Sequence, residues 1–433
     1  MTPVSLVTYE AGNNALKTAI ELVNGLESLS PSDRIMIKPN LVAWDDQHPI
    51  APYGVFTTTR LVEDLVILLK DLGCQHIRIG EGSVEVKKGV GTPRAFEGLG
   101  YKALEKRYGV NLVDFNQSSH DAFPIHDDLK LRIAKEALAC DFFIDFPVLK
   151  THGQTKVSLG MKNLKGCLKK TAKRQCHNPK YPLEDNFSHL ADIIKPALTI
   201  IDGIYALERG AFHYGNAYPK NLIIASKDTF AADLAGAKLM GFDGEDIDHF
   251  GYYAARHGRS LNVNELDIRG EALDAHIQPL KWDWTWTEEN TGPGVFKKMG
   301  ITGVALPKYD ETLCSGCSPI ANMSNLLVMS AFKGEPLPRV EILNGKKMQA
   351  RPGFDKTVLL GNCIIKANEN NPNISEVVEV KGCPPAEEDV VAAFQSVGLA
   401  VDPAFYQGYL KQQSEKYEGR EGYHPEFFKA ASD

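Results

Sequence analysis

Short apolar runs typical of strands alternate with helical runs through the first 240 residues, and this alternation narrows the folds open to the chain. Strands are predicted at 34–38, 76–80, 110–114, 141–146, 197–201 and 221–225. Helices are predicted between them, and the segment 59–72 has clear helical periodicity and ends before Gly73. The pattern predicts an α/β fold in which helices cover both faces of a mostly parallel sheet.

Polar residues follow several of these strands. Ligands bind beyond the carboxyl ends of the strands in such sheets, so Lys38, Asn40, Asp202 and Glu208 are predicted substrate-binding residues. Asp202 could instead only cap the turn after its strand. Neither G-x-G-x-x-G nor G-x-x-x-x-G-K-[ST] occurs at these turns, so no standard nucleotide site is indicated.

A block of lysines follows the strand at 141–146. The net charge of the chain is −7, so a local cationic block is expected to attract an anionic ligand such as a carboxylate or a phosphate. For 169–174 a solvated helix face explains the charges equally well. A lone histidine is more often structural than catalytic. The residues predicted to act in catalysis are Lys150, His152 and Lys162, and those predicted to bind substrate are Asn163 and Lys165.

Four of the eight cysteines lie in the last third of the chain, at Cys314, Cys317, Cys363 and Cys383. The first two form a C-x2-C turn, 45 residues separate the second from the third, and 19 separate the third from the fourth. A C-x2-C turn directs two sulfurs at one metal site. The glycines before the last two cysteines let the backbone approach a bulky group. The pattern predicts that all four thiolates hold one [4Fe–4S] cluster.

Zinc is the alternative metal. Compact zinc sites usually pair two closely spaced knuckles, whereas the second pair of cysteines is widely split here. A third interpretation is that Cys363 and Cys383 are small buried residues at strand ends. A cluster with a full set of cysteine ligands favours electron transfer over Lewis-acid chemistry, which needs an open iron site.

The composition suggests three parts: a ligand-binding α/β domain at 1–300, a smaller cysteine-ligated α/β metal domain at 301–400, and a polar tail at 401–433. Trp282, Trp284 and Trp286 alternate along an extended segment, and we expect them to pack in the core. Asn344-Gly345 predicts a β-hairpin in the smaller domain.

Neither a signal peptide nor a membrane span is predicted, and the eight cysteines are ordinary for reduced thiols or ligands. We therefore expect a cytoplasmic protein. The negative net charge argues against nucleic acid as a partner. The sequence leaves a homo-oligomer open.

Three motifs carry a family resemblance. They are K-P-N-L at 38–41, P-V-L-K-T-H-G with S-L-G-M-K-N-L-K-G at 147–166, and I-I-D-G-I-Y-A-L-E-R-G at 200–210. Together with D-T-F-A-A-D at 228–233 they resemble the Domain of Unknown Function 362 family over about 30–245. The family is often associated with iron–sulfur clusters, so the resemblance implies one here. Its frequent ferredoxin-like C-x2-C-x2-C-x3-C-P run is absent, which implies a single cluster.

The lysine and histidine segment is also distantly similar to that of the nickel-pincer lactate racemase family, as an analogy only. The sequence thus predicts an iron–sulfur oxidoreductase, or electron-transfer enzyme, that acts on an anionic small molecule and exchanges electrons with a partner protein. The alternative is a non-redox protein, either a ligand-binding protein or an isomerase or lyase, in which the four cysteines hold a structural zinc or cluster.

Overall fold

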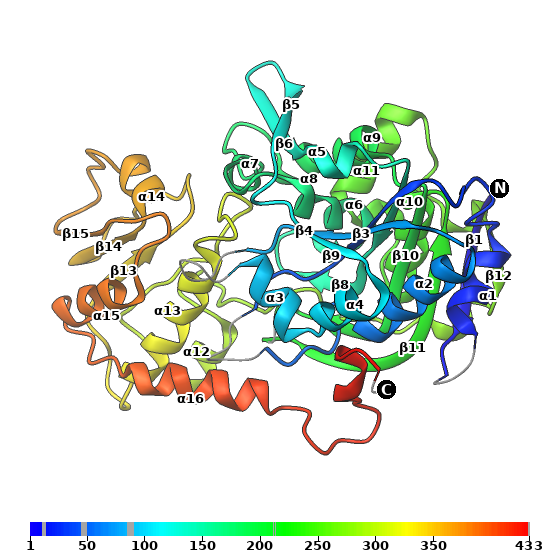
Figure 1. Ribbon diagram of the computed structural model, residues 1–433. Helices are drawn as coiled ribbons and strands as arrows, with labels where there is room; N and C mark the ends of the chain where they lie inside the picture. Colours follow the sequence, from blue (N-terminus) through cyan, green and yellow to red (C-terminus); the bar gives the residue numbers. More distant parts are fainter. Residues whose placement is uncertain (11–13, 45–49, 85–90, 211, 213, 432–433) are drawn as a thin grey trace. The chain divides into compact units, whose positions relative to one another are not determined.

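The computed structural model describes residues 1–10, 14–44, 50–84, 91–210, 212 and 214–431. The chain folds as two compact units. The first unit comprises 1–176, 184–283 and 414–433, and the second comprises 177–183 and 284–413. Figure 1 follows the chain through both.

The first unit is built on one large mixed sheet. Its strands are β1 (Thr2–Thr8), β2 (Arg34–Pro39), β3 (His76–Glu81), β4 (Asn111–Asp114), β7 (Phe142–Phe146), β8 (Val148–His152), β9 (Lys156–Ser158), β10 (Leu198–Glu208), β11 (Asn216–Ser226) and β12 (Leu266–Gly270). Their order is β12-β1-β11-β10-β7-β2-β3-β4, with β8 paired to β10 and β9. The pairs from β10 to β4 are parallel, while β11 runs antiparallel to both of its neighbours. The predicted mostly parallel α/β sheet is confirmed.

A separate hairpin joins β5 (His120–His126) and β6 (Leu129–Ala134). The helices before it are α1 (Ala15–Leu22), α2 (Thr59–Asp71), α3 (Thr92–Gly98) and α4 (Tyr101–Tyr108). The later helices are α5 (Lys135–Leu138), α6 (Gly160–Asn163), α7 (Lys170–Gln175), α8 (Leu183–Ser188), α9 (Leu190–Ile194), α10 (Thr229–Leu239) and α11 (Asp248–His257). Short 3-10 helices are η1 (Leu164–Cys167), η2 (Gly244–Asp246), η3 (Val263–Glu265), η4 (Leu273–His276) and η5 (Pro425–Phe428).

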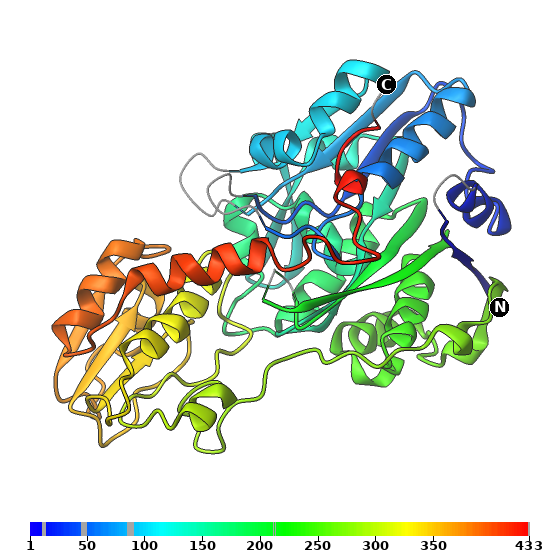
Figure 2. The ribbon, with the colours of Figure 1, turned by 90° about the horizontal axis from the view of Figure 1, so that it is seen from below.

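Helices cover both faces of the sheet (Figure 2). The apolar stripe of α2 includes Leu61, Leu65 and Leu69, which are fully buried in one core with Ile35 and Ile37 of β2. On the other face, α10 is buried along nearly its whole length and packs on β10 and β11. Helix α10 begins at Asp228, whose side chain accepts a hydrogen bond from the backbone N–H of Ala231 at 2.9 Å.

The C-terminal residues close the core under β10 and β11 (Figure 2). The phenol oxygen of Tyr417 accepts a hydrogen bond from the backbone N–H of Ala217 at 2.6 Å, and the Tyr423 hydroxyl donates to the Ala217 carbonyl at 2.7 Å. Both tyrosine rings contact Tyr53, which also meets Phe428. The end of the predicted polar tail is therefore part of the hydrophobic core of the first unit.

The second unit has a three-stranded parallel sheet in the order β13-β14-β15. Its elements are α12 (Gly294–Met299), α13 (Ser318–Ala331), β13 (Val340–Leu343), β14 (Lys356–Leu360), α14 (Asn362–Ala367), β15 (Val377–Val380), α15 (Glu387–Ser396) and α16 (Pro403–Ser414). The hairpin predicted at Asn344-Gly345 is wrong, because β13 pairs in parallel with β14 and 346–350 form no strand. Core packing is also wrong for Trp284, which is 43% exposed.

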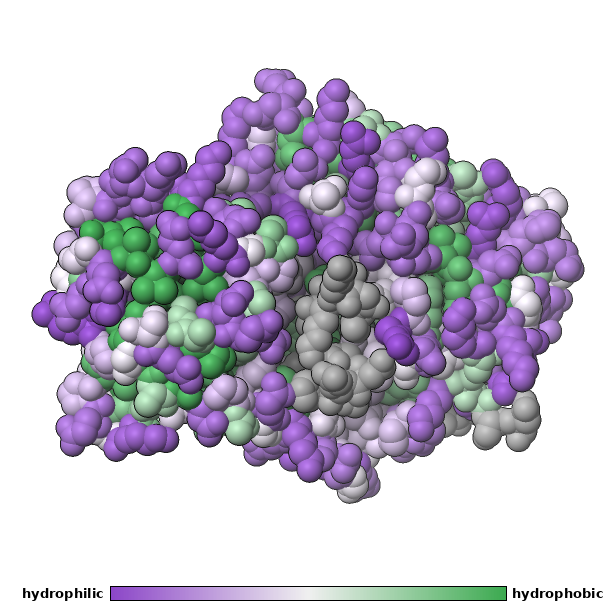
Figure 3. All heavy atoms as spheres, turned by 60° about the vertical axis from the view of Figure 1, so that its left-hand side comes forward, coloured by the Kyte–Doolittle hydropathy of each residue, from purple (hydrophilic) through white to green (hydrophobic). Residues whose placement is uncertain are grey.

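Hydrophilic residues dominate the face of the molecule drawn in Figure 3. In the part of the chain that the structure describes, no helix is both long enough and apolar enough to cross a membrane.

Candidate functional site

A buried polar network lies where β2 and β3 end. Lys38 and Glu81 are the penultimate and last residues of these strands, and their side chains are only 1% and 2% exposed. The Lys38 ammonium donates to Glu81 Oε2 at 2.9 Å, to Asn163 Oδ1 at 2.8 Å and to the Pro39 carbonyl at 2.8 Å. The Lys38 charge is thus compensated inside the protein, as a buried charge must be.

Two further residues extend this network toward a second lysine. The Asn40 amide donates to Asn163 Oδ1 at 2.9 Å, and its own Oδ1 accepts from Lys150 Nζ at 2.6 Å. Lys150 also donates to the Val55 carbonyl at 2.9 Å. Burial, followed by the charge of Lys38, lowers the pKa of Lys150 to about 7. The predicted residues Lys38, Asn40, Lys150 and Asn163 therefore form one connected group.

Lys162 lies on the short helix α6 beside this group. Its ammonium nitrogen is buried and has no hydrogen-bond partner among the described residues. Burial lowers the pKa of Lys162 well below its ordinary value, and the charges of Lys165 and Lys150 lower it further, against the opposing effect of Glu184. A neutral amine can bind a proton, attack a carbonyl carbon or become a cation when an anion arrives.

Sequence reasoning missed two buried acids at this site. Asp145 of β7 accepts from the Asn163 amide at 2.8 Å, and its other oxygen has no partner among the described residues. Asp233 of α10 accepts from the backbone N–H groups of Gly160 and Met161 at 2.7 and 2.8 Å. Burial raises the pKa of Asp145 well above its ordinary range and that of Asp233 to about 7. A lone acid inside the apolar run F-F-I-D-F was the available signal for Asp145.

Two glycines allow the backbone to approach the network closely. A Cβ atom at Gly166 would lie 2.3 Å from Glu81 Oε1 and 2.5 Å from Lys38 Cε. A Cβ atom at Gly82 would lie 2.4 Å from the Gly166 carbonyl oxygen. The last glycine of the K-N-L-K-G motif is therefore needed to seat the Lys38–Glu81 pair.

The other predicted residues make different contacts. His152 accepts through Nδ1 from the backbone N–H of Gln154 at 3.1 Å. Asp202 accepts from the N–H groups of Thr58 and Ile204, and Glu208 accepts from the Asn216 amide at 2.8 Å.

Lys165 stands over the Phe187 ring, with its nitrogen 5.7 Å from the centroid. Strand β10 continues to Glu208, so the expectation that Asp202 follows a strand end is wrong. None of these contacts reaches the Lys38–Lys150 network. This holds for the contacts described above for Lys165, His152, Asp202 and Glu208.

The four C-terminal cysteines converge in the second unit. Cys317 precedes α13, while Cys363 and Cys383 lie just after β14 and β15. A hydrogen bond from Cys317 lowers the pKa of the Cys314 thiol. The same contact raises the pKa of Cys317, and the neighbouring Cys383 and Cys363 raise it further.

Backbone contacts connect the start of α14, which carries Cys363, to the loop that carries Cys383. The N–H of Asn362 donates to the Gly382 carbonyl at 3.1 Å, and the N–H of Gly382 donates to Asn362 Oδ1 at 2.9 Å. A Cβ atom at Gly361, whose φ is +104°, would lie 3.8 Å from Cys317 Sγ. Gly361 therefore lies beside the Cys317 sulfur, and its positive φ is one that favours glycine.

Two kinds of metal centre suit four neighbouring cysteine thiols. One zinc ion can bind all four sulfurs, whereas in a [4Fe–4S] cluster each thiolate binds a different iron. The four cysteines of the second unit can supply either set of ligands.

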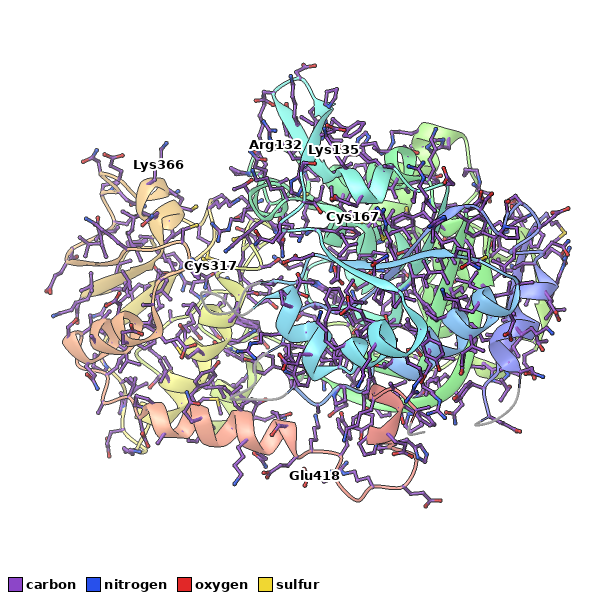
Figure 4. All side chains as sticks on the ribbon, in the orientation of Figure 1. Arg132, Lys135, Cys167, Cys317, Lys366 and Glu418 are labelled. Atoms are coloured by element: carbon purple, nitrogen blue, oxygen red, sulfur yellow. The ribbon has the colours of Figure 1, made fainter. Side chains whose placement is uncertain are left out.

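The remaining four cysteines belong to the first unit. Cys74, Cys167 and Cys176 are buried, and Cys140 is half-buried. Figure 4 labels Cys167 among the helices and strands of the first unit and Cys317 beside α13. No disulfide joins any two of the eight cysteines in the part of the chain that the structure describes.

Residues 35–238 match the model of a family described as a domain of unknown function, DUF362. A thylakoid-associated protein of Synechocystis sp. is 28% identical over 272 residues, which cover 60% of this chain and 79% of that protein. Among solved structures, the lactate racemase apoprotein from Thermoanaerobacterium thermosaccharolyticum matches with a TM-score of 0.36 and 14% identity. That match covers 56% of this chain and 58% of the racemase.

Proposed function

From the premise that residues 35–238 are a DUF362 domain, we propose that the chain is an iron–sulfur oxidoreductase acting on an anionic small molecule. The observation that carries the proposal is the convergence of Cys314, Cys317, Cys363 and Cys383 in the second unit, with Gly361 beside the Cys317 sulfur. A bound [4Fe–4S] cluster supplies one-electron transfer.

The lysine network supports an anionic substrate. Lys162 and Lys150 both have pKa values lowered by burial, and the Lys162 nitrogen has no partner among the described residues. A carboxylate or phosphate beside these amines would stabilise their charged forms and supply the missing hydrogen-bond acceptor. Lys38 and Asn163 hold Asn40, which in turn fixes the orientation of Lys150.

Proton transfer is assigned to the amines of this site. With a pKa of about 7, Lys150 can release or accept a proton near neutral pH. The burial of Lys150 and Lys162 keeps water away from both nitrogens. We assign His152 only to the turn that follows β8, because its Nδ1 already accepts from Gln154.

The partner and the location follow from the same proposal. A cluster-bearing enzyme needs an electron-transfer protein as donor or acceptor, and exposed Cys363 and Cys383 mark the side of the metal site open to one. Eight cysteines without a disulfide among the described residues are ordinary in a reducing compartment, so we propose a cytoplasmic location.

Anaerobic purification tests the metal centre. We expect four iron atoms and four acid-labile sulfides per chain, with visible absorbance that dithionite bleaches. Cys363→Ser and Cys383→Ser should lose most of the iron and the absorbance, whereas Cys140→Ser, remote in sequence and outside the metal loops, should keep both. One equivalent of zinc without sulfide, or full absorbance in both metal-loop variants, would contradict the cluster.

Substrate turnover tests the redox role. A panel of small carboxylates and phosphate esters is added to the dithionite-reduced protein, and reoxidation of the cluster is followed by absorbance. Wild type should reoxidise with at least one member of the panel, and Lys162→Met should lose that response while keeping the iron. Reoxidation by no anion in the panel would contradict the redox role.

The Lys162 amine, whose pKa is lowered by burial and which has no hydrogen-bond partner among the described residues, specifically favours a second candidate, a non-redox lyase or isomerase whose metal unit is structural. Such an enzyme would form an imine between Lys162 and a carbonyl substrate. Borohydride in the presence of a panel of oxo acids would then trap a covalent adduct on Lys162, detected by mass spectrometry. Adduct formation that survives removal of iron favours this candidate over the redox one.

A further inference from the structure

Two histidines and one aspartate meet in the first unit, and none of them belongs to the lysine network described above. His126 ends β5, Asp185 lies on α8, and His189 follows α8 directly. The ligand atoms of these three residues all lie within 4.8 Å of one another. His126 Nε2 lies 3.6 Å from Asp185 Oδ2, and His189 Nε2 lies 3.6 Å from Asp185 Oδ1.

We propose that His126, Asp185 and His189 bind one divalent first-row transition cation, with two imidazoles and one carboxylate on the same side of the ion. Metal–nitrogen and metal–oxygen bonds of about 2.1 Å place neighbouring ligand atoms about 3.0 to 3.4 Å apart. The separations of 3.6 Å are therefore close to those that a bound ion requires.

The local structure brings these ligands together. Asp185 and His189 are four residues apart, so one helical turn places both side chains on the same face. The end of the β5–β6 hairpin supplies His126 from a distant part of the sequence. The two imidazole rings stand at 86° to each other with centroids 5.7 Å apart, so their nitrogens can point at a common centre.

The side-chain oxygen of Asn186 is a fourth polar atom beside these ligands. Asn186 Oδ1 is hydrogen-bonded to His126 Nε2 at 2.9 Å, so a bound ion would replace this hydrogen bond. The Asn186 amide donates to the Cys176 carbonyl at 2.8 Å, which fixes the direction of Oδ1. The three main ligands are half-buried, with side chains between 17% and 22% exposed, so an ion and a water or substrate molecule can reach them.

The chemical types of the three ligand side chains determine which metal ions the site would favour. Imidazole nitrogen suits zinc and iron, whereas magnesium and calcium prefer sites made of oxygen. Two histidines and one carboxylate leave open positions on the metal, as in catalytic zinc and non-haem iron sites.

An ion-pair cluster is the competing explanation. Arg256 lies 3.4 Å from Asp185 Oδ1, and its guanidinium also contacts Asp192 at 3.2 Å. Asp192 also pairs with His257 at 2.6 Å. Arg256 therefore contacts a second histidine–aspartate pair, which differs from the proposed site because it has one imidazole instead of two. This neighbouring pair is a matched control for the proposed site.

Cobalt(II) titration of the anaerobic full-length protein tests the proposal. Wild type should bind one equivalent with visible d–d absorption that lacks the sulfur-to-metal band expected at a thiolate site. Asp185→Asn and His189→Ala should weaken that equivalent by at least about tenfold, while His257→Ala should keep it. Circular dichroism checks that each variant is folded. If His189→Ala does not fold, the isosteric Asp185→Asn variant alone tests the proposal.

Two outcomes would overturn the site. Equal cobalt binding by wild type and Asp185→Asn would leave only an ion-pair cluster. Loss of binding in His257→Ala to the same extent as in His189→Ala would place the ion elsewhere. Iron and sulfide content of the cysteine site is measured in parallel, so failure of this proposal is distinguishable from failure of the proposed function.

Discussion

Lys162 occupies an environment that a charged amine disfavours. It is buried on α6, its pKa is lowered by burial and by nearby lysines, and the described residues give its nitrogen no partner. Such a group lowers the stability of the ligand-free protein, because the unfolded chain can protonate it freely. A buried lysine with a strongly lowered pKa is typical of a functional position.

Replacement of this lysine by methionine gives a residue-scale prediction. Between the lowered folded pKa and the ordinary value of 10.5, the unfolded state of wild type binds more protons at this group, so the unfolding free energy rises with pH. Lys162→Met removes that contribution. The variant should be more stable than wild type near pH 7, by about 1–3 kcal/mol, and the advantage should shrink toward pH 10.

Urea unfolding at several pH values measures the effect. Lys102→Met, at an exposed lysine of α4, is the control and should leave the pH dependence unchanged. A Lys162→Met variant that is less stable than wild type at every pH would show that the lysine is charged and paired in the folded protein.

At the scale of elements, β10 and β11 are held together partly by the C-terminal segment. The buried N–H of Ala217 in β11 has the Tyr417 hydroxyl as its acceptor. Segments 200 residues apart in sequence thus complete one ladder, and the aromatic cluster around Tyr53 depends on the same contact.

Tyr417→Phe should lower the unfolding free energy by about 1–3 kcal/mol, because it leaves a buried N–H group without an acceptor. The matched control is Tyr252→Phe on α11, since the hydroxyl of Tyr252 makes no hydrogen bond to the residues that the structure describes. That control should change stability by less than about 0.5 kcal/mol. Chemical denaturation measures both, and equal effects would mean that the tail contributes only apolar packing.

Particular residues show which elements the sequence predicted correctly and which it did not. Strand and helix periods located most of the large sheet, and the K-T-H and K-N-L-K-G motifs identified the lysines that the structure brings together. Asp145 was missed, because an acid within an apolar run is read as part of a strand. The β-hairpin predicted from Asn344-Gly345 was wrong, because a local turn signal cannot reveal that the next strand pairs in parallel. Asp202 lies within β10 because the strand continues through an irregularity after Gly203.

The roles assigned to the lysines, His152 and the four cysteines stay predictions, since they concern ligands and electrons. Convergence of distant loops depends on tertiary packing, which spacing alone does not encode. The pair of Asp185 and His189 had a visible i, i+4 spacing, but its partner His126 comes from a hairpin that periodicity did not locate.

At the scale of the whole molecule, the chain divides into two units with separate cores. The four cysteines belong to the second unit, which is the smaller of the two and whose sheet has three strands. A metal centre that joins three loops should stabilise a small unit more than a large one.

Calorimetry of Cys363→Ser checks this expectation. In the variant, the melting transition of the smaller unit should occur at a lower temperature than in wild type. The transition of the larger unit should move little. Cys140→Ser in the larger unit serves as the control and should leave the lower transition in place. A single transition that shifts as a whole in Cys363→Ser would show that the two units unfold together.

The lowered pKa values of Lys150 on β8 and Lys162 on α6 also tie ligand entry to the acidity of the solution. An anion that settles beside Lys150 and Lys162 raises their affinity for hydrogen ions, so each arriving molecule draws protons out of the surrounding buffer. The heat of association should then differ between phosphate and Tris in proportion to the ionisation enthalpy of each buffer, and affinity should decline as the medium becomes more alkaline.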